Sequence, residues 1–446
     1  TLRIPTELIL TETTMADSIV NLIRSMAPEK LVNELGSDGF LKAPYEQLSL
    51  AISGLDVEKN TAAMVVLLSA QAKITEKTKD VIKVITYQEE WSNRVTALLG
   101  QLETRQLSLV VEDLKLITQT YADVMIKKKP IAGIKPLRTL IKRYSPGATF
   151  ITPQHASFVQ LCLAAENYTA ALPIIGDHPF ELNVEKTAVD GKDVRIYLYY
   201  AGMAWIGNGK WEEAIEVLRA CVQVPAQGCS AIVLEAYKKF VLASLIHHGS
   251  AEPLSKGFIP SVQRHAKQYA LYDDLASAYG TNSLEVVHKA ILQNKDALVK
   301  DKNFGLAKQL FESLQRRIVH SLTKTFLTLS LSDIASRIAL DSVEETEAYI
   351  VACIKRGEIQ ASISQKDGMV SFQGSSNANA NATRSDLDER LKQFMKLSMT
   401  LENADYAMST DVKYIEKMIS LDKPGSMGGG GRGAMDDDTA VMMMRG

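Results

Sequence analysis

Cysteine is scarce in this sequence of 446 residues, which contains only four such residues. They are Cys162, Cys221, Cys229 and Cys353. No two of them form a Cys-x-x-Cys pair, so the spacing of a zinc ribbon or a redox dithiol is absent. Disulfide frameworks belong to short secreted chains, and all four cysteines stand in apolar, helix-like segments. We therefore expect free, buried thiols in a reducing compartment.

Motifs that carry enzyme chemistry are also absent. No two of the seven histidines are two, three or four positions apart, which excludes the common His-x-His and His-Glu-x-x-His metal sites. The stretch Gly207–Trp211 has Trp211 where a phosphate-binding loop needs a serine or threonine for magnesium. Gly-x-Ser-x-Gly does not occur, and the glycine-rich residues 428–433 follow no predicted strand. The sequence thus predicts no catalytic residue, no metal site and no cofactor.

Long apolar runs and an excess of one charge are missing as well. The longest apolar run, residues 62–70, is far shorter than the ~20 residues that span a bilayer. No signal peptide is visible, although the chain begins at Thr1. Lysine and arginine number 50 against 52 acidic residues, so the net charge of −2 gives no general attraction to nucleic acid or membrane. We expect a soluble intracellular protein.

Helical periodicity is what the sequence has in abundance. Hydrophobic residues make up 46% and charged residues 23%, which is ordinary for globular chains with a sizeable core. Residues 17–26 place four apolar side chains on one helix face, and we expect N-terminal helical repeats over 1–130. Pro130 then punctuates the chain before a second set of helices over 131–320. Three lysines at 127–129 could contact nucleic acid, but lysines at a helix end also favour the helix dipole, which is the interpretation we prefer.

Residues 202–222 carry the spacing of a tetratricopeptide repeat (TPR). Its small residues let two antiparallel helices approach closely, and its large residues fill the gap between neighbouring pairs. The positions are Gly202, Trp205, Gly209, Trp211, Ala214, Leu218, Cys221 and Val222. Residues 167–175 and 303–311 repeat the second half of the pattern at irregular offsets. We expect a degenerate TPR-like solenoid with extended surfaces for partners, and a generic stack of amphipathic helices is the alternative.

Residues 321–373 have the pattern of a winged helix. Ser332 is expected to cap a first helix, and Ser342 with Glu345 forms a capping box for a second helix that stops at Gly357. Two alternating segments then follow, 358–364 and 369–372, joined by the turn at 365–368. The sequence therefore predicts two helices and a two-stranded wing, and the fold class is mainly α.

Winged helices often bind DNA, but the charges disfavour that function here. Residues 321–373 contain five basic and seven acidic residues, a net charge of −2. Glu344, Glu345 and Glu347 stand at the start of the second helix, where a recognition helix would contact base edges, and they repel phosphate. The strand at 369–373 is expected to be an open edge that pairs with another chain. A nucleic-acid-binding winged helix remains an alternative.

A long C-terminal helix is expected over 386–420, after a low-complexity linker at 374–385 and before a disordered tail at 421–446. Apolar residues fill eight of ten positions that alternate by three and four, with Ser398 and Asp405 in the other two. The eight are Leu387, Leu391, Phe394, Leu401, Met408, Val412, Ile415 and Ile419. The pattern favours a bundle with helices of other chains, and docking onto the chain's own solenoid is the alternative.

Three segments carry a family resemblance: residues 234–246, 322–338 and 357–372. The order of solenoid, winged helix and long helix resembles the PCI proteins, which are scaffold subunits of the proteasome lid, the COP-nine signalosome and a translation initiation complex. The segments themselves are most similar to the subunit-three family of the signalosome. The resemblance covers roughly residues 130–375, and neither the first ~100 residues nor the tail carries a matching signature.

The resemblance implies a function that composition alone does not. The signalosome removes the ubiquitin-like modifier from cullins and so regulates cullin–RING ubiquitin ligases, and its zinc isopeptidase centre lies on a different subunit. This chain would then be a non-catalytic scaffold in the cytoplasm and nucleus, without nucleic-acid or membrane partners. PCI winged helices join edge to edge, which here implicates Met369, Val370 and Phe372.

The same resemblance assigns roles to the helix and to partners. The C-terminal helices of the family gather in a common bundle, which here implicates the eight apolar positions from 387 to 419. The neighbours implied for this subunit are the first and the eighth. The corresponding subunit of the proteasome lid, which shares the winged helix, is the alternative.

Overall fold

The computed structural model describes residues 17–21, 23–24, 43–57, 59–78, 80–224, 230–252, 266–340, 342–372, 380–412 and 415. The chain divides into two compact units. The first comprises Thr1–Leu322 with Ser330–Cys353, and the second comprises Thr323–Leu329 with Ile354–Gly446. The predicted tail at 421–446 and Cys229 lie outside the described residues.

The first unit begins with helices that pack side by side. They are α3 (Tyr45–Ser53), α4 (Thr61–Lys77), α5 (Val81–Gln101), α6 (Thr104–Leu107), α7 (Val111–Lys128) and α8 (Pro130–Tyr144). Helix α4 is buried along most of its length, so it forms the centre of this group. Trp91 of α5 is also buried, and its indole N–H donates to the carbonyl oxygen of Leu68 at 3.0 Å, which satisfies the ring's single donor.

The boundary expected at Pro130 does not separate two compact units. Pro130 occupies the start of α8, where a missing backbone N–H costs nothing, and Pro136 lies inside the same helix. Helix α8 packs against α5 and α7, and both α7 and α8 contact α9 (Pro153–Ala164). The expected N-terminal and middle repeats are therefore parts of one unit.

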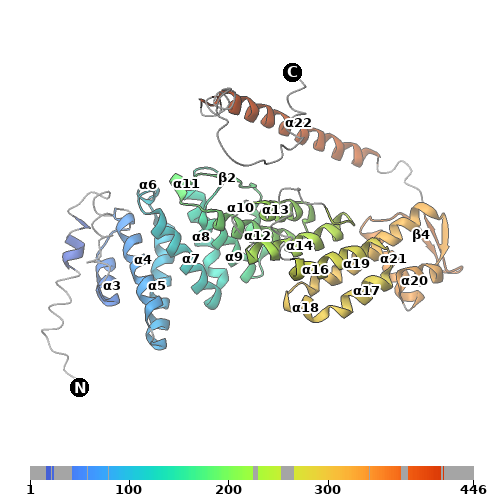
Figure 1. The fold of residues 1–446 in the computed structure, drawn as a ribbon, viewed down its shortest axis with the longest axis horizontal. Helices are drawn as coiled ribbons and strands as arrows, with labels where there is room; N and C mark the ends of the chain where they lie inside the picture. Colours follow the sequence, from blue (N-terminus) through green and yellow to red (C-terminus); the bar gives the residue numbers. More distant parts are fainter. Residues whose placement is uncertain are drawn as a thin grey trace, which may run out of the picture. The chain divides into compact units, whose positions relative to one another are not determined.

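The helices continue as antiparallel neighbours, as Figure 1 shows. The elements after α9 are η2 (Tyr168–Ala171), α10 (Leu172–Ile175), α11 (Val184–Thr187), α12 (Gly191–Gly207), α13 (Trp211–Gln223), α14 (Ala231–His247), α16 (Ala266–Gly280), α17 (Leu284–Gln293), α18 (Lys295–Lys300) and α19 (Phe304–Thr325). Helix α12 packs on α9, α13 on α12, α14 on α13 and α16 on α14. A short parallel pair, β1 (Phe150–Ile151) and β2 (Glu181–Leu182), lies between these helices in the chain. The predicted solenoid is confirmed.

Glycines explain how closely the α12–α13 pair packs. A Cβ atom added to Gly202 would lie 2.6 Å from the Leu218 side chain, and one added to Gly207 would lie 2.5 Å from the Tyr168 ring. Gly209 in the connecting turn has a φ of +71°, which other residues rarely adopt. Ala214 and Leu218 are fully buried on the facing side of α13. The spacing at residues 202–222 thus correctly predicted a close approach of α12 and α13.

A buried polar cluster joins later helices of the solenoid. The amine of Lys238 lies 2.8 Å from carboxylate oxygens of Glu235 and of Asp301. The Tyr272 hydroxyl also donates to Asp301 at 2.8 Å, and the Asn303 amide donates to that hydroxyl at 2.8 Å. Burying a charge is costly unless it is paired and hydrogen-bonded, and each charge here has such partners.

The two helices of the winged-helix segment, α20 (Leu331–Ile338) and α21 (Val343–Lys355), belong to the first unit. The expected cap at Ser332 is wrong, because Ser330 takes that position and its hydroxyl accepts from the Asp333 amide at 3.1 Å. Ser342 accepts from the Glu345 amide at 3.1 Å, which is one of the two hydrogen bonds of the expected capping box. Ile334 and Ile338 are fully buried. Cys162, Cys221 and Cys353 are buried and belong to no disulfide, as expected.

The second unit holds a three-stranded sheet rather than a two-stranded wing. Its strands are β3 (Thr328–Ser330), β4 (Ala361–Ser364) and β5 (Met369–Phe372), in the order β3-β5-β4. Strand β4 is antiparallel to β5, with Ile363 opposite Val370. The long helix α22 (Ala380–Thr410) follows, and it begins within the segment predicted to be a linker.

None of the helices in the described ranges is long and apolar enough to cross a membrane.

Candidate assembly surfaces

The sheet of the second unit presents a different edge from the one expected. Strand β5 lies between β3 and β4, so the prediction of an open edge at 369–373 is wrong. Val370 is 0% exposed and Phe372 is also buried, whereas Met369 is half-buried. Val370 and Phe372 are therefore core residues of this chain, and no strand edge is left at their position for a neighbour.

Strand β3 is the strand of this sheet that was not expected from the sequence. The Phe372 amide donates to the carbonyl oxygen of Leu327 at 2.8 Å, which ties β5 to the segment before α20. A signal for this strand is present, because leucines at 327, 329 and 331 alternate with polar residues at 328, 330 and 332. Because a helix cap was expected at Ser332, these alternating residues were not predicted to form a strand. The edges of the sheet are thus β3 and β4.

Edge strand β4 presents a mostly polar surface. Its serines at 362 and 364 are exposed, and Ala361 and Ile363 are half-buried. One side of β4 pairs with β5, and within the described residues the other side has no strand partner. Such an edge offers backbone donors and acceptors to a strand of another chain.

Helix α22 carries the second surface, and its predicted apolar residues are exposed. Leu391 is 54% exposed and Phe394 is 71% exposed. The other predicted positions with described side chains are also exposed: Leu401 and Met408 on α22, and Val412 and Ile415 just beyond its end at Thr410. The side chain of Leu387 and all of Ile419 lie outside the described residues. A helix with this much apolar surface in water needs partners that cover it.

The exposed apolar surface of α22 is wider than the sequence pattern predicted. Four further large apolar residues are exposed on it: Met395, Leu397, Met399 and Tyr406. At 100° per residue, the apolar positions together cover about 200° of the helix circumference. The heptad pattern did not include these four residues, because it considers only the apolar positions along one narrow strip of the helix surface. A band this wide exceeds what a single facing helix covers.

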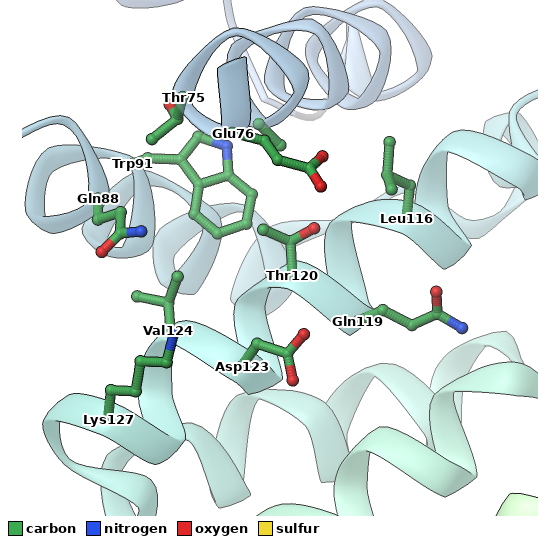
Figure 2. A pocket seen from close by; sticks show the side chains of 11 residues that line it. Thr75, Glu76, Gln88, Trp91, Leu116, Gln119, Thr120, Asp123, Val124 and Lys127 are labelled. Carbon is green, nitrogen blue, oxygen red and sulfur yellow. The ribbon is translucent and has the colours of Figure 1, made fainter. Parts of the chain in front are cut away.

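The first unit contains a cavity of about 410 Å³ between α4, α5 and α7. Figure 2 shows the Trp91 ring with the carboxylates of Glu76 and Asp123 and the side chain of Lys127 around it. Partial burial raises the pKa of Asp123, and the charge of Lys127 opposes that shift. The lining contains no histidine, cysteine or serine, so it offers neither a thiolate nor an imidazole base.

The part of the chain that the structure describes contains no cluster of side chains suited to hold a metal ion. No group of three or more histidine, cysteine, aspartate or glutamate side chains there is placed to hold a metal ion. The surfaces that stand out are therefore an edge strand and an apolar helix, which are the kinds of surface that pair with other chains in proteins generally.

Comparison with known proteins decides the family. The model for the N-terminal helical repeats of COP9 signalosome complex subunit 3 matches residues 29–262, and the PCI domain model matches residues 284–373. The chain belongs to the COP9 signalosome subunit 3 family. The resemblance expected from three short segments is confirmed, and it extends toward the N-terminus well beyond residue 130.

Two curated relatives agree with the family models. The COP9 signalosome complex subunit 3 of Drosophila melanogaster is 31% identical over 379 residues, which cover 80% of this chain and 83% of that protein. The corresponding subunit of Dictyostelium discoideum is 28% identical over 416 residues, which cover 92% of this chain and 97% of that protein. Because the Dictyostelium match covers 92% of this chain, it runs through the solenoid, the sheet and α22.

Proposed function

We propose that the chain is a non-catalytic scaffold subunit of a COP9 signalosome, the assembly that deneddylates cullins and thereby regulates cullin–RING ligases. The observation that carries the proposal is the wide exposed apolar band of α22 in a chain of the subunit 3 family. Exposed apolar surface of this extent marks a protein interface. The chain's contribution would be assembly, and the isopeptidase chemistry would belong to another subunit.

Helix α22 would be the main anchor. Its apolar band of about 200° is wide enough to contact helices on two sides, as in the interior of a helical bundle. Each large apolar side chain that becomes buried contributes roughly 1.5–3 kcal/mol. Leu391 and Phe394 lie one turn apart near the start of the described exposed face, so they are the most informative positions to change.

The β4 edge would be the second contact. A neighbouring winged-helix sheet could add a strand beside Ala361–Ser364, because that side of β4 has no strand partner among the described residues. This replaces the contact first expected at Val370 and Phe372, which are buried. We propose the first and eighth signalosome subunits as the neighbours, on the family resemblance.

Nucleic-acid binding by the winged helix is disfavoured by charge. Glu344 and Glu345 stand exposed in the first turn of α21, the position from which a recognition helix contacts DNA. Two carboxylates there repel phosphate.

Purification of the tagged chain from its own cells, followed by mass spectrometry of the intact assembly, tests the proposal. We expect the other signalosome subunits and cullin deneddylase activity in the purified material. Recovery of proteasome subunits instead would place the chain in the lid, and recovery of the chain alone would contradict the scaffold function.

A further inference from the structure

The most basic stretch of the chain lies in the solenoid, which belongs to the first unit, whereas β4 and α22 belong to the second. Residues 127–143 contain seven basic residues and no acidic residue, in a protein whose net charge is −2. They are Lys127, Lys128, Lys129, Lys135, Arg138, Lys142 and Arg143. The stretch spans the end of α7 and nearly all of α8. The proposed scaffold function gives this concentration of positive charge no role.

Helix α8 sorts its residues onto two faces. Its buried residues are Gly133, Ile134, Leu137, Leu140 and Ile141. A separate face carries Ile131, Lys135, Arg138 and Lys142, whose spacing of four, three and four residues places them in one row. At 1.5 Å per residue this row, the α8 stripe, is about 16 Å long. Ile131 is 68% exposed, Lys135 and Lys142 are exposed, and Arg138 is half-buried.

Contacts within the chain do not account for the α8 stripe. Among the described residues, the ion pairs within 4.0 Å include none of Lys135, Arg138 and Lys142. Lys127, by contrast, interacts with Asp123, and Arg143 donates to the carbonyl oxygen of Gly100 at 3.1 Å. The stripe therefore presents its charge to solvent.

The helix dipole explains only part of the stretch. Lys127 and Lys128 lie in the last turn of α7, and Lys142 lies in the last turn of α8, where positive charge is favourable. Lys135 and Arg138 lie in the middle of α8, and the dipole effect does not reach them. Two of the three cations of the stripe thus have no structural explanation.

The neighbourhood of the stripe adds positive charge. The Tyr144 hydroxyl donates to the carbonyl oxygen of Lys186 at 3.0 Å, which places that exposed lysine beside the end of α8. Lys129, the residue that precedes α8, is exposed at the other end. Both ends of the stripe are therefore flanked by lysines, and the field attracts an anionic partner.

The chemistry of the stripe fits a polypeptide better than a nucleic acid. Three cations in one row contact few phosphates, and affinity for nucleic acid grows with the number of phosphates that a protein neutralises. Proteins that bind single strands also stack the bases on aromatic side chains, and the one aromatic residue of α8, Tyr144, is half-buried with its hydroxyl bonded. The exposed Ile131 instead offers an apolar contact, which side chains of a peptide can use.

We propose that the α8 stripe is a docking surface for a short acidic polypeptide segment of a partner protein. An extended segment rises about 3.3 Å per residue, so about five residues cover the stripe. Their carboxylates pair with Lys135, Arg138 and Lys142, and an apolar residue at one end contacts Ile131. The surface is independent of the scaffold contacts made by α22 and β4.

Fluorescence anisotropy with the purified full chain and a labelled oligoglutamate of about ten residues tests the proposal. We expect binding at low salt that weakens steeply as salt is added, because exposed charges are screened. The triple variant Lys135→Glu, Arg138→Glu and Lys142→Glu should bind at least about tenfold more weakly. Glutamine at the same three positions, which keeps helix propensity, should give a smaller loss in the same direction.

The matched control reverses three exposed lysines elsewhere in the solenoid: Lys83→Glu, Lys289→Glu and Lys300→Glu. It changes the net charge equally and should retain affinity within about twofold. Equal weakening in both triple variants would mean that overall charge, and not the stripe, binds the peptide. Tighter binding of an oligouridylate of equal charge would identify a nucleic-acid surface, and no peptide binding at low salt would also overturn the proposal.

Discussion

The backbone amide of Phe372 donates a hydrogen bond to the carbonyl oxygen of Leu327 at 2.8 Å. This bond joins β5 to β3 and makes β5 the central strand of its sheet. Val370, two residues before Phe372, is consequently buried within its own chain. The sheet is therefore completed by a strand that precedes the two helices of the winged helix.

Replacing Val370 with aspartate should unfold the sheet even in the isolated chain. Val370 is 0% exposed, and an unpaired carboxylate there costs on the order of 3 kcal/mol or more. Hydrogen exchange measured by mass spectrometry should show that the amides of β4 and β5 lose protection.

The matched variant Ser362→Asp introduces the same charge at an exposed position of β4 and should leave that protection unchanged. If Val370→Asp left exchange unaltered while weakening association, Val370 would be an interface residue after all and the strand order would be wrong.

Gly207→Ala should destabilise the solenoid where α12 meets η2. The added methyl group would lie 2.5 Å from the Tyr168 ring, so the ring or the helix must move, at a cost of about 1–3 kcal/mol. Thermal denaturation followed by circular dichroism measures the loss. In a chain that also carries Tyr168→Ala, Gly207→Ala should cost less stability, because the ring that the added methyl group would meet is absent.

Gly305→Ala is the control, since a Cβ at that helical position meets nothing within 4 Å. It should be neutral or slightly stabilising because alanine favours helix. Equal effects of the two substitutions would show that helix propensity, and not the contact with Tyr168, determines the outcome.

Acid should weaken the solenoid through His155. The Thr152 amide donates to Nδ1 of His155 at 3.1 Å, and burial lowers the pKa of the imidazole to about 4 from 6.5. Between these values the unfolded chain binds a proton that the folded chain does not, so the free energy of unfolding falls as the pH is lowered. The loss should begin near pH 6.5 and reach on the order of 3 kcal/mol near pH 4.

His155→Gln should make the free energy of unfolding less dependent on pH. Glutamine at the third helical position can also bond the backbone amide of a capping threonine, and it does not titrate. Urea denaturation at several pH values between 4 and 7 measures it. The variant His288→Gln, which makes the same replacement at an exposed histidine, is measured alongside for comparison. An identical slope in His155→Gln would assign the acid sensitivity to other groups.

Local spacing was enough to predict the solenoid and the long helix α22 with its apolar residues. Gly202 and Leu218 were found because a close helix crossing needs a small residue opposite a large one, and the structure places them in contact. Leu391 and Phe394, which are exposed in the structure, were predicted to lie on an apolar strip because they occupy heptad positions, a pattern typical of helices that pack against other helices.

The sheet could not be predicted in the same way. Strand β3 has only three residues, and its pairing with β5 joins segments that lie more than 40 positions apart, from 328 to 372. The width of the α22 surface was missed because Met395 and Met399 lie outside the seam that a heptad template tests. Such features depend on strand partners and on exposure around a whole helix, which a short window of sequence does not contain.

Assembly through α22 is the central claim, and co-purification of a Leu391→Asp, Phe394→Asp double variant tests it most directly. Both side chains are exposed on the apolar band, and two charges there oppose burial in a bundle. A Gln393→Asp, Thr400→Asp variant adds the same charge to the opposite, polar face of the helix. We predict that the first variant loses the other signalosome subunits while its circular dichroism is unchanged, and that the second variant retains them. Full recovery of the subunits with the first variant would contradict the account.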